Sequence, residues 1–175
     1  EMNTSGWYGP AMNIHRTAFA GRNFEYYSED GVLSGAMAAN AIAGAQEHGV
    51  YAYMKHFALN DQEGNRNCMA ATWSNEQAIR EIYMRAFEGS LAEGDSLGVM
   101  TAYNRIGVMY AAANQGIQHI LRDEWNYGGY IIDDALTASE YSSAPEMLMA
   151  GNNIFCLDTA RPTEIEKLIT STDDG

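Results

Sequence analysis

Two adjacent aspartates, Asp133 and Asp134, end an apolar run that begins at Gly128. A carboxylate that leaves a β-branched strand and enters a cleft can act as a nucleophile, a general base or a metal ligand. Aspartate is also a common helix N-cap, so either residue could instead cap a following helix. Because the two are adjacent, one can cap while the other points into a cleft, and both interpretations stay open.

Lys55 and His56 end a second apolar run, Val50–Met54. Adjacent strand residues point to opposite faces, but at a strand end the chain twists and both side chains can reach one pocket. A lysine and a neutral histidine donate hydrogen bonds to hydroxyl oxygens, as a polyol substrate requires. The alternative is a salt-bridged lysine beside a core histidine.

Two arginines and a tyrosine could also contact a polyol substrate. Arg22 lies in a loop with acidic residues nearby, so it is either a bidentate donor to vicinal hydroxyls or an ion-pair partner of those acids. Arg66 has the same ambiguity. Tyr103, at the end of a third apolar run, can line the face of a sugar while offering its hydroxyl.

Short apolar runs alternate along the chain with patterns of helical period. Strands are expected at Trp7–Ile14, Val50–Phe57, Leu97–Tyr103, Tyr130–Asp133 and Asn153–Leu157. Helices are expected at Leu33–Glu47, Asn75–Ala92, Asn114–Asp123, Glu140–Ala150 and Glu164–Ile169, and Ser74 with Gln77 forms a capping-box pattern before the second of them. This alternation predicts an α/β fold with a parallel sheet covered by helices.

The polar residues at the strand ends help to distinguish a closed parallel barrel from an open sheet. The carboxyl ends of parallel strands open onto one face, where active sites assemble. Lys, His, Tyr and Asp at successive strand ends therefore indicate a shared pocket. The pattern favours a TIM-like parallel (β/α) barrel over an open sheet.

The composition excludes several classes of function. Ten Lys and Arg stand against 23 Asp and Glu, and the net charge of −13 argues against nucleic acid or an anionic membrane surface as partner. No apolar stretch approaches the ~18 residues of a membrane span. The histidines show no metal-ligand spacing and the chain has no phosphate-binding glycine loop, so we expect no metal and no cofactor. Two cysteines slightly favour the cytoplasm but leave the compartment unknown.

Four segments, in order along the chain, resemble glycoside hydrolase family 3, the β-glucosidase family. They are Gly21–Asp30 with Arg22, Lys55–Arg66, Met100–Arg105 with Tyr103, and Leu121–Asp134. Their order and spacing cover nearly the whole chain. The N-acetylglucosaminidase branch is disfavoured, because Ala58–Asn60 follows Lys-His-Phe where that branch typically carries Pro-Gly-His.

The resemblance implies a β-glucosidase-type enzyme that cleaves terminal non-reducing β-linked sugars by a retaining mechanism. It implies Asp134 as the nucleophile, Arg22, Lys55, His56 and Arg66 as binders of sugar hydroxyls, and Tyr103 beside the nucleophile. Ala135 departs from the family, which frequently has a Trp there that shapes the aglycone side.

The length of the chain limits which domains it can contain. The 175 residues fall short of the ~250 typical of an eight-stranded barrel. We therefore expect residues 1–175 to be a partial family 3 barrel domain carrying the nucleophile. By resemblance, the early barrel strands and a following α/β sandwich domain, which usually supplies the acid/base Glu, lie outside the chain.

The missing acid/base leaves a second hypothesis. Glu25, Glu63 or Asp158 could serve as that second carboxyl group, and nothing in the sequence selects one. A chain without an acid/base would be a catalytically inert carbohydrate-binding or structural fragment, since retaining enzymes use two carboxyl groups. The isolated fragment is accordingly expected to be inactive or impaired.

Overall fold

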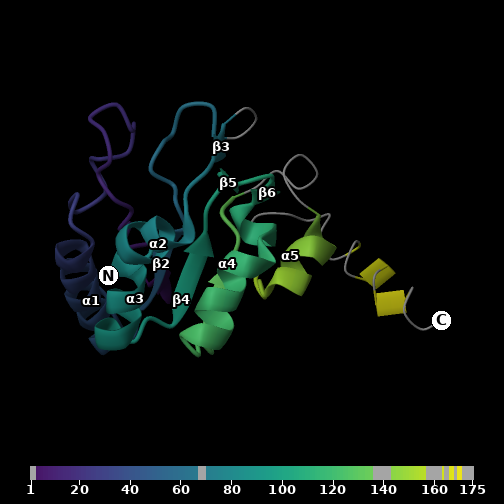
Figure 1. Ribbon diagram of the computed structural model, residues 1–175. Helices are drawn as coiled ribbons and strands as arrows, with labels where there is room; N and C mark the ends of the chain where they lie inside the picture. Colours follow the sequence, from purple (N-terminus) through teal and green to yellow (C-terminus); the bar gives the residue numbers. More distant parts are fainter. Residues whose placement is uncertain are drawn as a thin grey trace.

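A four-stranded parallel sheet forms the centre of the computed structural model (Figure 1), which describes residues 3–66, 70–135, 143–156, 163, 166–167 and 169–170. Its strands are β1 (Gly6–Trp7), β2 (Tyr51–Phe57), β4 (Gly98–Thr101) and β7 (Tyr130–Ile132), in the order β1-β2-β4-β7. Every neighbouring pair is parallel. The parallel sheet expected from the alternating pattern is therefore confirmed.

Every expected strand is shorter in the structure, as at Leu97–Tyr103, of which Gly98–Thr101 forms β4, and two are much shorter. The strand expected at Trp7–Ile14 is wrong beyond Trp7, apart from a single bridge between Ala11 and Lys55. Pro10 has no N–H to donate to a ladder, which explains why regular pairing stops before it. Of the strand expected at Asn153–Leu157, the structure has one bridge from Ile154 to Ile132, and Leu157 lies outside the described residues.

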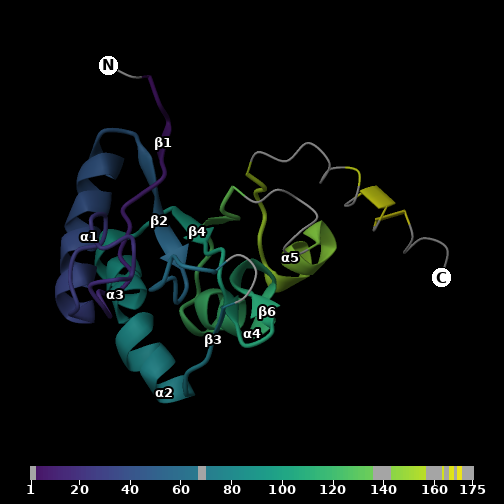
Figure 2. The same ribbon diagram turned by 90° about the horizontal axis from the view of Figure 1, so that it is seen from above.

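The helices cover the sheet on its outer side. Figure 2 shows α1 (Gly31–Glu47) and α3 (Arg85–Gly94) together beside β2, with α4 (Gln115–His119) and α5 (Ala144–Ala150) beyond β4. Helix α1 begins where the Asp30 carboxylate accepts hydrogen bonds from the N–H groups of Val32, at 2.7 Å, and Leu33, at 3.1 Å. A side-chain cap of this kind satisfies donors that the first turn leaves without a partner.

The helix expected at Asn75–Ala92 is present but irregular. It consists of α2 (Glu76–Ala78), a π-helical turn η1 (Ile79–Tyr83) and α3. The cap expected at Ser74 is wrong, because the side chain of Asn75 accepts the Ala78 N–H at 2.8 Å. Asparagine caps as well as serine does, so the pattern located the helix start one residue early.

A second π-helical turn, η3 (Ile120–Glu124), extends α4 and completes the helix expected at Asn114–Asp123. Helix α5 begins at a capping box made by Ser143 and Glu146. Residues 140–142 of its expected start lie outside the described residues, as do 164, 165 and 168 of the helix expected at Glu164–Ile169, whose other three residues are helical.

A small second sheet was not expected. It consists of β3 (Ala71–Thr72), β5 (Arg105–Ile106) and β6 (Met109–Tyr110), followed by the 3-10 turn η2 (Ala111–Ala113). These two-residue strands are too short to leave a periodic pattern in the sequence. In Figure 1 they lie with the loops above the carboxyl ends of β2 and β4, so they belong to the face that carries the polar strand ends.

The main core lies between the sheet and the helices. Phe57 of β2 packs edge-on against Phe87 of α3 with ring centroids 5.3 Å apart, and against Trp125 at 6.1 Å. Phe57 and Phe87 are fully buried, as are Met54 of β2 and Ile131 of β7. Burial of both faces explains why these strands read as continuous apolar runs.

The described part of the chain contains no helix that combines the length and the hydropathy of a membrane span. No group of three or more potential metal ligands occurs among the same residues.

Helices α1 and α3 pack closely enough to reverse the usual effect of a glycine-to-alanine change. A Cβ at Gly94 would lie 2.8 Å from the Ala39 Cα and 2.9 Å from its carbonyl oxygen, whereas at Gly44 it would meet no described atom within 4 Å. Helical Gly→Ala normally stabilises by up to about 1 kcal/mol. We expect Gly44→Ala to raise the free energy of unfolding and Gly94→Ala to lower it by about 1–3 kcal/mol, measured by urea denaturation. A stabilised Gly94→Ala would contradict this packing.

Candidate active site

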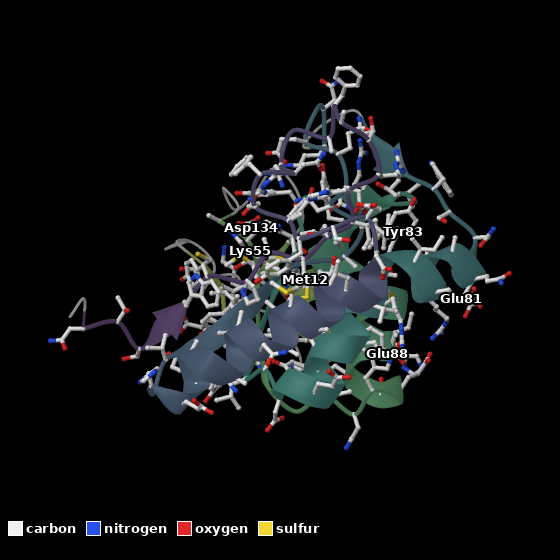
Figure 3. All side chains as sticks on the ribbon, turned by 90° about the vertical axis from the view of Figure 1, so that its left-hand side faces the viewer. Met12, Lys55, Glu81, Tyr83, Glu88 and Asp134 are labelled. Atoms are coloured by element: carbon white, nitrogen blue, oxygen red, sulfur yellow. The ribbon has the colours of Figure 1, made fainter. Side chains whose placement is uncertain are left out.

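The six residues singled out from the sequence converge at the carboxyl ends of the strands. Lys55 and His56 are near the end of β2, Tyr103 follows β4, and Asp134 follows β7. Arg22 and Arg66 reach the same region from the loops before α1 and after β2. Figure 3 labels Asp134 and Lys55 close together above Met12.

Asp134 is held at the centre of this group. Its Oδ1 accepts the Ala135 N–H at 2.8 Å, and its Oδ2 lies 3.7 Å from the His56 Nε2. Burial raises the pKa of Asp134 above its ordinary range, against the Ala135 hydrogen bond and the charges of Arg66, Arg22 and Lys55. Desolvation therefore disfavours the ionised form of Asp134, and the surrounding positive charge favours it.

Asp133 points elsewhere. It is fully buried, its Oδ1 accepts the Cys156 N–H, and its own N–H donates to the Ile154 carbonyl at 3.3 Å. Ser143 caps α5, the next described helix of any length, so neither aspartate caps it. Of the two adjacent aspartates, Asp134 is the one beside the other site residues.

His56 combines both sequence interpretations, because it is a buried histidine that also borders the site. Its N–H donates to the Asn13 Oδ1 at 2.8 Å, and its carbonyl accepts from the Asn13 Nδ2 at 3.0 Å. Its Nδ1 lies 3.4 Å from the Tyr26 hydroxyl. Burial, aided by the charges of Arg22, Lys55 and Arg66, lowers the pKa of His56 to about 2. The imidazole is therefore neutral at any ordinary pH.

The cations at the site are paired with acids, which was the alternative interpretation of the arginines and the lysine. The Arg22 guanidinium bonds to Glu25 and lies 3.8 Å from Glu63. The Lys55 Nζ lies 3.4 Å from Glu25, and Arg66 lies 3.0 Å from Glu63. A guanidinium has five N–H donors and an ammonium group has three. An ion pair uses only some of them, so Arg22, Arg66 and Lys55 can still donate hydrogen bonds to hydroxyl groups.

Tyr103 is the sixth residue of the site. The Arg66 Cζ lies 4.5 Å from the centroid of the Tyr103 ring, a cation–π distance, and the Tyr103 hydroxyl donates to the Ala135 carbonyl. The tyrosine therefore contacts both Arg66 and the residue after Asp134. The prediction that it would sit beside the aspartate is consistent with these contacts.

The two described acids that could act as a second catalytic carboxyl are both paired with cations of the site. Glu25 is paired with Arg22 and Lys55, and Glu63 with Arg22 and Arg66. Both side chains therefore already act as ion-pair partners of the cations at the site. Asp158 lies outside the described residues.

Sequence reasoning missed several supporting residues. Arg122 donates to the carbonyls of Tyr127, at 2.9 Å, Gly129, at 2.7 Å, and Gly151, at 2.9 Å, and so holds the entry to β7. Tyr26, buried beside His56, donates its hydroxyl to the Asn60 carbonyl at 3.1 Å. Neither residue follows a strand, so the strand-end criterion did not find them.

Asp61 was also missed. It is 4% exposed, and its Oδ1 accepts the Ile14 N–H at 2.8 Å, which ties the segment after β1 to the loop that carries Arg66. Together with Arg16, Arg66 and Trp73 it lines a cavity of about 290 Å³. Burial raises the pKa of Asp61 from 3.8 to about 7, against that hydrogen bond and the charge of Arg16.

Residues 2–175 match the model of the glycosyl hydrolase family 3 N terminal domain. The chain belongs to glycosyl hydrolase family 3. This agrees with the resemblance carried by the four sequence segments.

Its relatives are β-glucosidases of greater length. Beta-glucosidase A of Butyrivibrio fibrisolvens is 40% identical over 155 residues, which are 88% of this chain and 18% of that protein. Beta-glucosidase 3B from Thermotoga neapolitana, solved with glucose, superposes with a TM-score of 0.86 at 39% identity over 98% of this chain and 24% of that one. The family 3 β-glucosidase of Bifidobacterium adolescentis gives 0.87 at 34% identity, again over 98% and 24%.

These likenesses determine the architecture of the family 3 chain. Its parallel strands and outer helices form an incomplete TIM-like barrel, as in the N-terminal domains of those enzymes. The expectation of a (β/α) barrel over an open sheet is confirmed. In such a barrel the loops at the carboxyl ends of the strands carry the active site.

The raised pKa of Asp61 predicts a pH-dependent stability for the family 3 chain. In the folded state the carboxyl group keeps its proton up to about pH 7, whereas in the unfolded state it ionises near its ordinary 3.8. The stability that Asp61 contributes is therefore complete below pH 3.8 and is lost as the pH rises to about 7. Asp61→Asn removes this dependence and keeps an oxygen for the Ile14 N–H.

We expect the free energy of unfolding of Asp61→Asn, relative to the parent chain, to rise by up to about 1.4 kcal/mol per pH unit across that window. Denaturant titrations at pH 4, 5, 6 and 7 measure the difference. Parallel curves for the two proteins would show that Asp61 is not protonated in the fold.

Proposed function

We propose that this chain is the nucleophile-bearing part of a β-glucosidase-type exo-glycosidase, and that Asp134 is the nucleophile of a retaining reaction. The observation that carries the proposal is the convergence of Asp134 with Lys55, His56 and two arginines at the strand ends of a family 3 barrel. A carboxylate among several hydroxyl-binding donors is the arrangement that sugar hydrolysis needs.

The chemistry follows from the charge balance of the site. In the first step an Asp134 oxygen bonds to the anomeric carbon while the glycosidic bond breaks and the leaving oxygen takes a proton from an acid. Water then displaces the carboxylate. Burial makes the carboxylate a poorly solvated and therefore reactive anion, and the charges of Arg66, Arg22 and Lys55 oppose its protonation.

The surrounding donors recognise the sugar under this proposal. Lys55, Arg22 and Arg66 are permanent donors to hydroxyl oxygens, and the neutral His56 adds a donor or acceptor that does not change with pH. The Tyr103 ring adds an aromatic face beside Asp134. A site with this many donors selects a polyhydroxylated ligand without needing net negative charge on it.

The domain organisation is part of the proposal. We infer that residues 1–175 are a partial barrel domain, and that the early barrel strands and an α/β sandwich domain belong to the same parent protein outside this chain. The chain spans 18% of the Butyrivibrio enzyme and 24% of the Thermotoga enzyme, which supports this division. The acid/base would then come from outside this chain.

Loss of the nucleophile tests the assignment directly. In the full-length parent enzyme, Asp134→Ala should lower kcat for aryl β-glucosides by about 10⁴-fold or more, because no covalent intermediate can form without the carboxylate. Asp123→Ala is the matched control, since that aspartate is exposed and paired with His119. Unchanged turnover in Asp134→Ala would contradict the assignment of Asp134 as the nucleophile.

The isolated chain tests the place of the acid/base. With a dinitrophenyl β-glucoside, whose leaving group needs no proton, the folded chain should form a glucosyl adduct on the Asp134 peptide and release β-glucosyl azide when azide is added. A p-nitrophenyl β-glucoside should be turned over at least about 100-fold more slowly than by the parent enzyme. Rapid hydrolysis of it by the chain alone would contradict an external acid/base, and a folded chain that is never labelled would indicate the inert carbohydrate-binding fragment.

A further inference from the structure

Two glutamates that the proposed reaction does not use link the three cations of the site into one chain of alternating charge. The order is Lys55, Glu25, Arg22, Glu63 and Arg66. The distances are 3.4 Å from Lys55 to Glu25, 3.8 Å from Arg22 to Glu63 and 3.0 Å from Glu63 to Arg66, and Glu25 bonds directly to Arg22. Each glutamate therefore bridges two cations.

Four of the five members of this network are largely buried. The side chains of Arg22, Glu25 and Lys55 are 17–19% exposed and that of Arg66 is 11% exposed, whereas that of Glu63 is 38% exposed. Like charges repel strongly where water is largely excluded, so three cations at one site need intervening anions to stay together. Exposed pairs typically contribute little, but a half-buried network restrains the geometry of its members.

The backbone builds the contact between the two loops. The Glu63 N–H donates to the Ala20 carbonyl at 2.8 Å, and Gly21 adopts φ +93° with its face against Glu63. A Cβ at Gly21 would lie 2.8 Å from the Glu63 Cβ, so a side chain there would push the loops apart. Glycine at this position lets the Arg22 loop approach the Glu63 loop, which places the carboxylate between the two arginines.

We propose that Glu25 and Glu63 are positioning residues, which hold Arg22, Lys55 and Arg66 in the arrangement that receives the sugar beside Asp134. The inference deepens the proposed function and rests on it for its effect on catalysis. The charges also balance, since three cations and two glutamates leave one positive charge for Asp134 to neutralise. Removal of one glutamate would leave an excess of positive charge beside the nucleophile.

Kinetics of the parent enzyme provide the first test. Glu63→Gln keeps the shape of the side chain and removes its charge, and it should raise KM for an aryl β-glucoside by about tenfold with a smaller change in kcat. The acid limb of kcat/KM should move to lower pH, because the uncompensated cations favour the ionised nucleophile. Glu63→Asp, which keeps the charge, should recover part of the loss.

A double-mutant cycle separates positioning from direct participation. In an Arg22→Met background, Glu63→Gln should cost several-fold less than in the parent enzyme, because one of its two partners is already absent. The matched control is Glu88→Gln, since Glu88 pairs with Arg85 at 2.8 Å and lies well away from Asp134 and Lys55 in Figure 3. Purely additive losses from Arg22→Met and Glu63→Gln would overturn the inference.

A second readout does not depend on activity. A guanidinium held in an ion pair is less available to phenylglyoxal, so loss of the carboxylate in Glu63→Gln should speed the modification of Arg22 and Arg66 by about threefold. The rates are followed by peptide mass spectrometry. In Glu88→Gln only Arg85 should respond. Unchanged rates at Arg22 and Arg66 would overturn the positioning role even where Asp134→Ala abolishes hydrolysis. Faster rates in a parent enzyme that cleaves no β-glucoside would support the positioning and reject the proposed function.

Discussion

The parallel pairing of β2, β4 and β7 is the constraint on which the site depends. Pairing in one direction brings the ends of these strands to one edge, so residues separated by about 30 to 80 positions begin within reach of one another. The core beneath them, centred on Phe57 and Phe87, keeps that edge in place. The site is therefore a consequence of strand direction before any side chain contributes its own chemistry.

The second organising factor is the competition between burial and charge. Burial raises the pKa of Asp134 and of Asp61, and lowers that of His56, each in the direction of the neutral form. At Asp134 the neighbouring cations oppose this effect, whereas His56 is pushed further toward neutrality by them. One set of positive charges thus favours an ionised carboxylate and an uncharged imidazole side by side.

Much of the fold was predictable because strands and helices leave periodic signals. The strand ending at Phe57, most of the strand expected at Tyr130–Asp133 and the helix ending at Glu47 all followed from local patterns. The family followed from the resemblance of four ordered segments. The failures have local causes as well. Pro10 interrupts the first expected strand, Asn75 rather than Ser74 caps its helix, and two-residue strands such as β3 are too short to detect.

The sequence by itself determined the family, the parallel sheet and the candidate residues Arg22, Lys55, His56, Arg66, Tyr103 and Asp134. Only the tertiary structure showed that Asp133 is turned toward the backbone of Cys156, and that Glu25 and Glu63 bridge the cations of the site. The physical reason is that periodicity encodes which residues are buried in an element. Ion-pair partners depend on which loops approach one another in the folded chain. No periodic pattern in the sequence shows which loops do so.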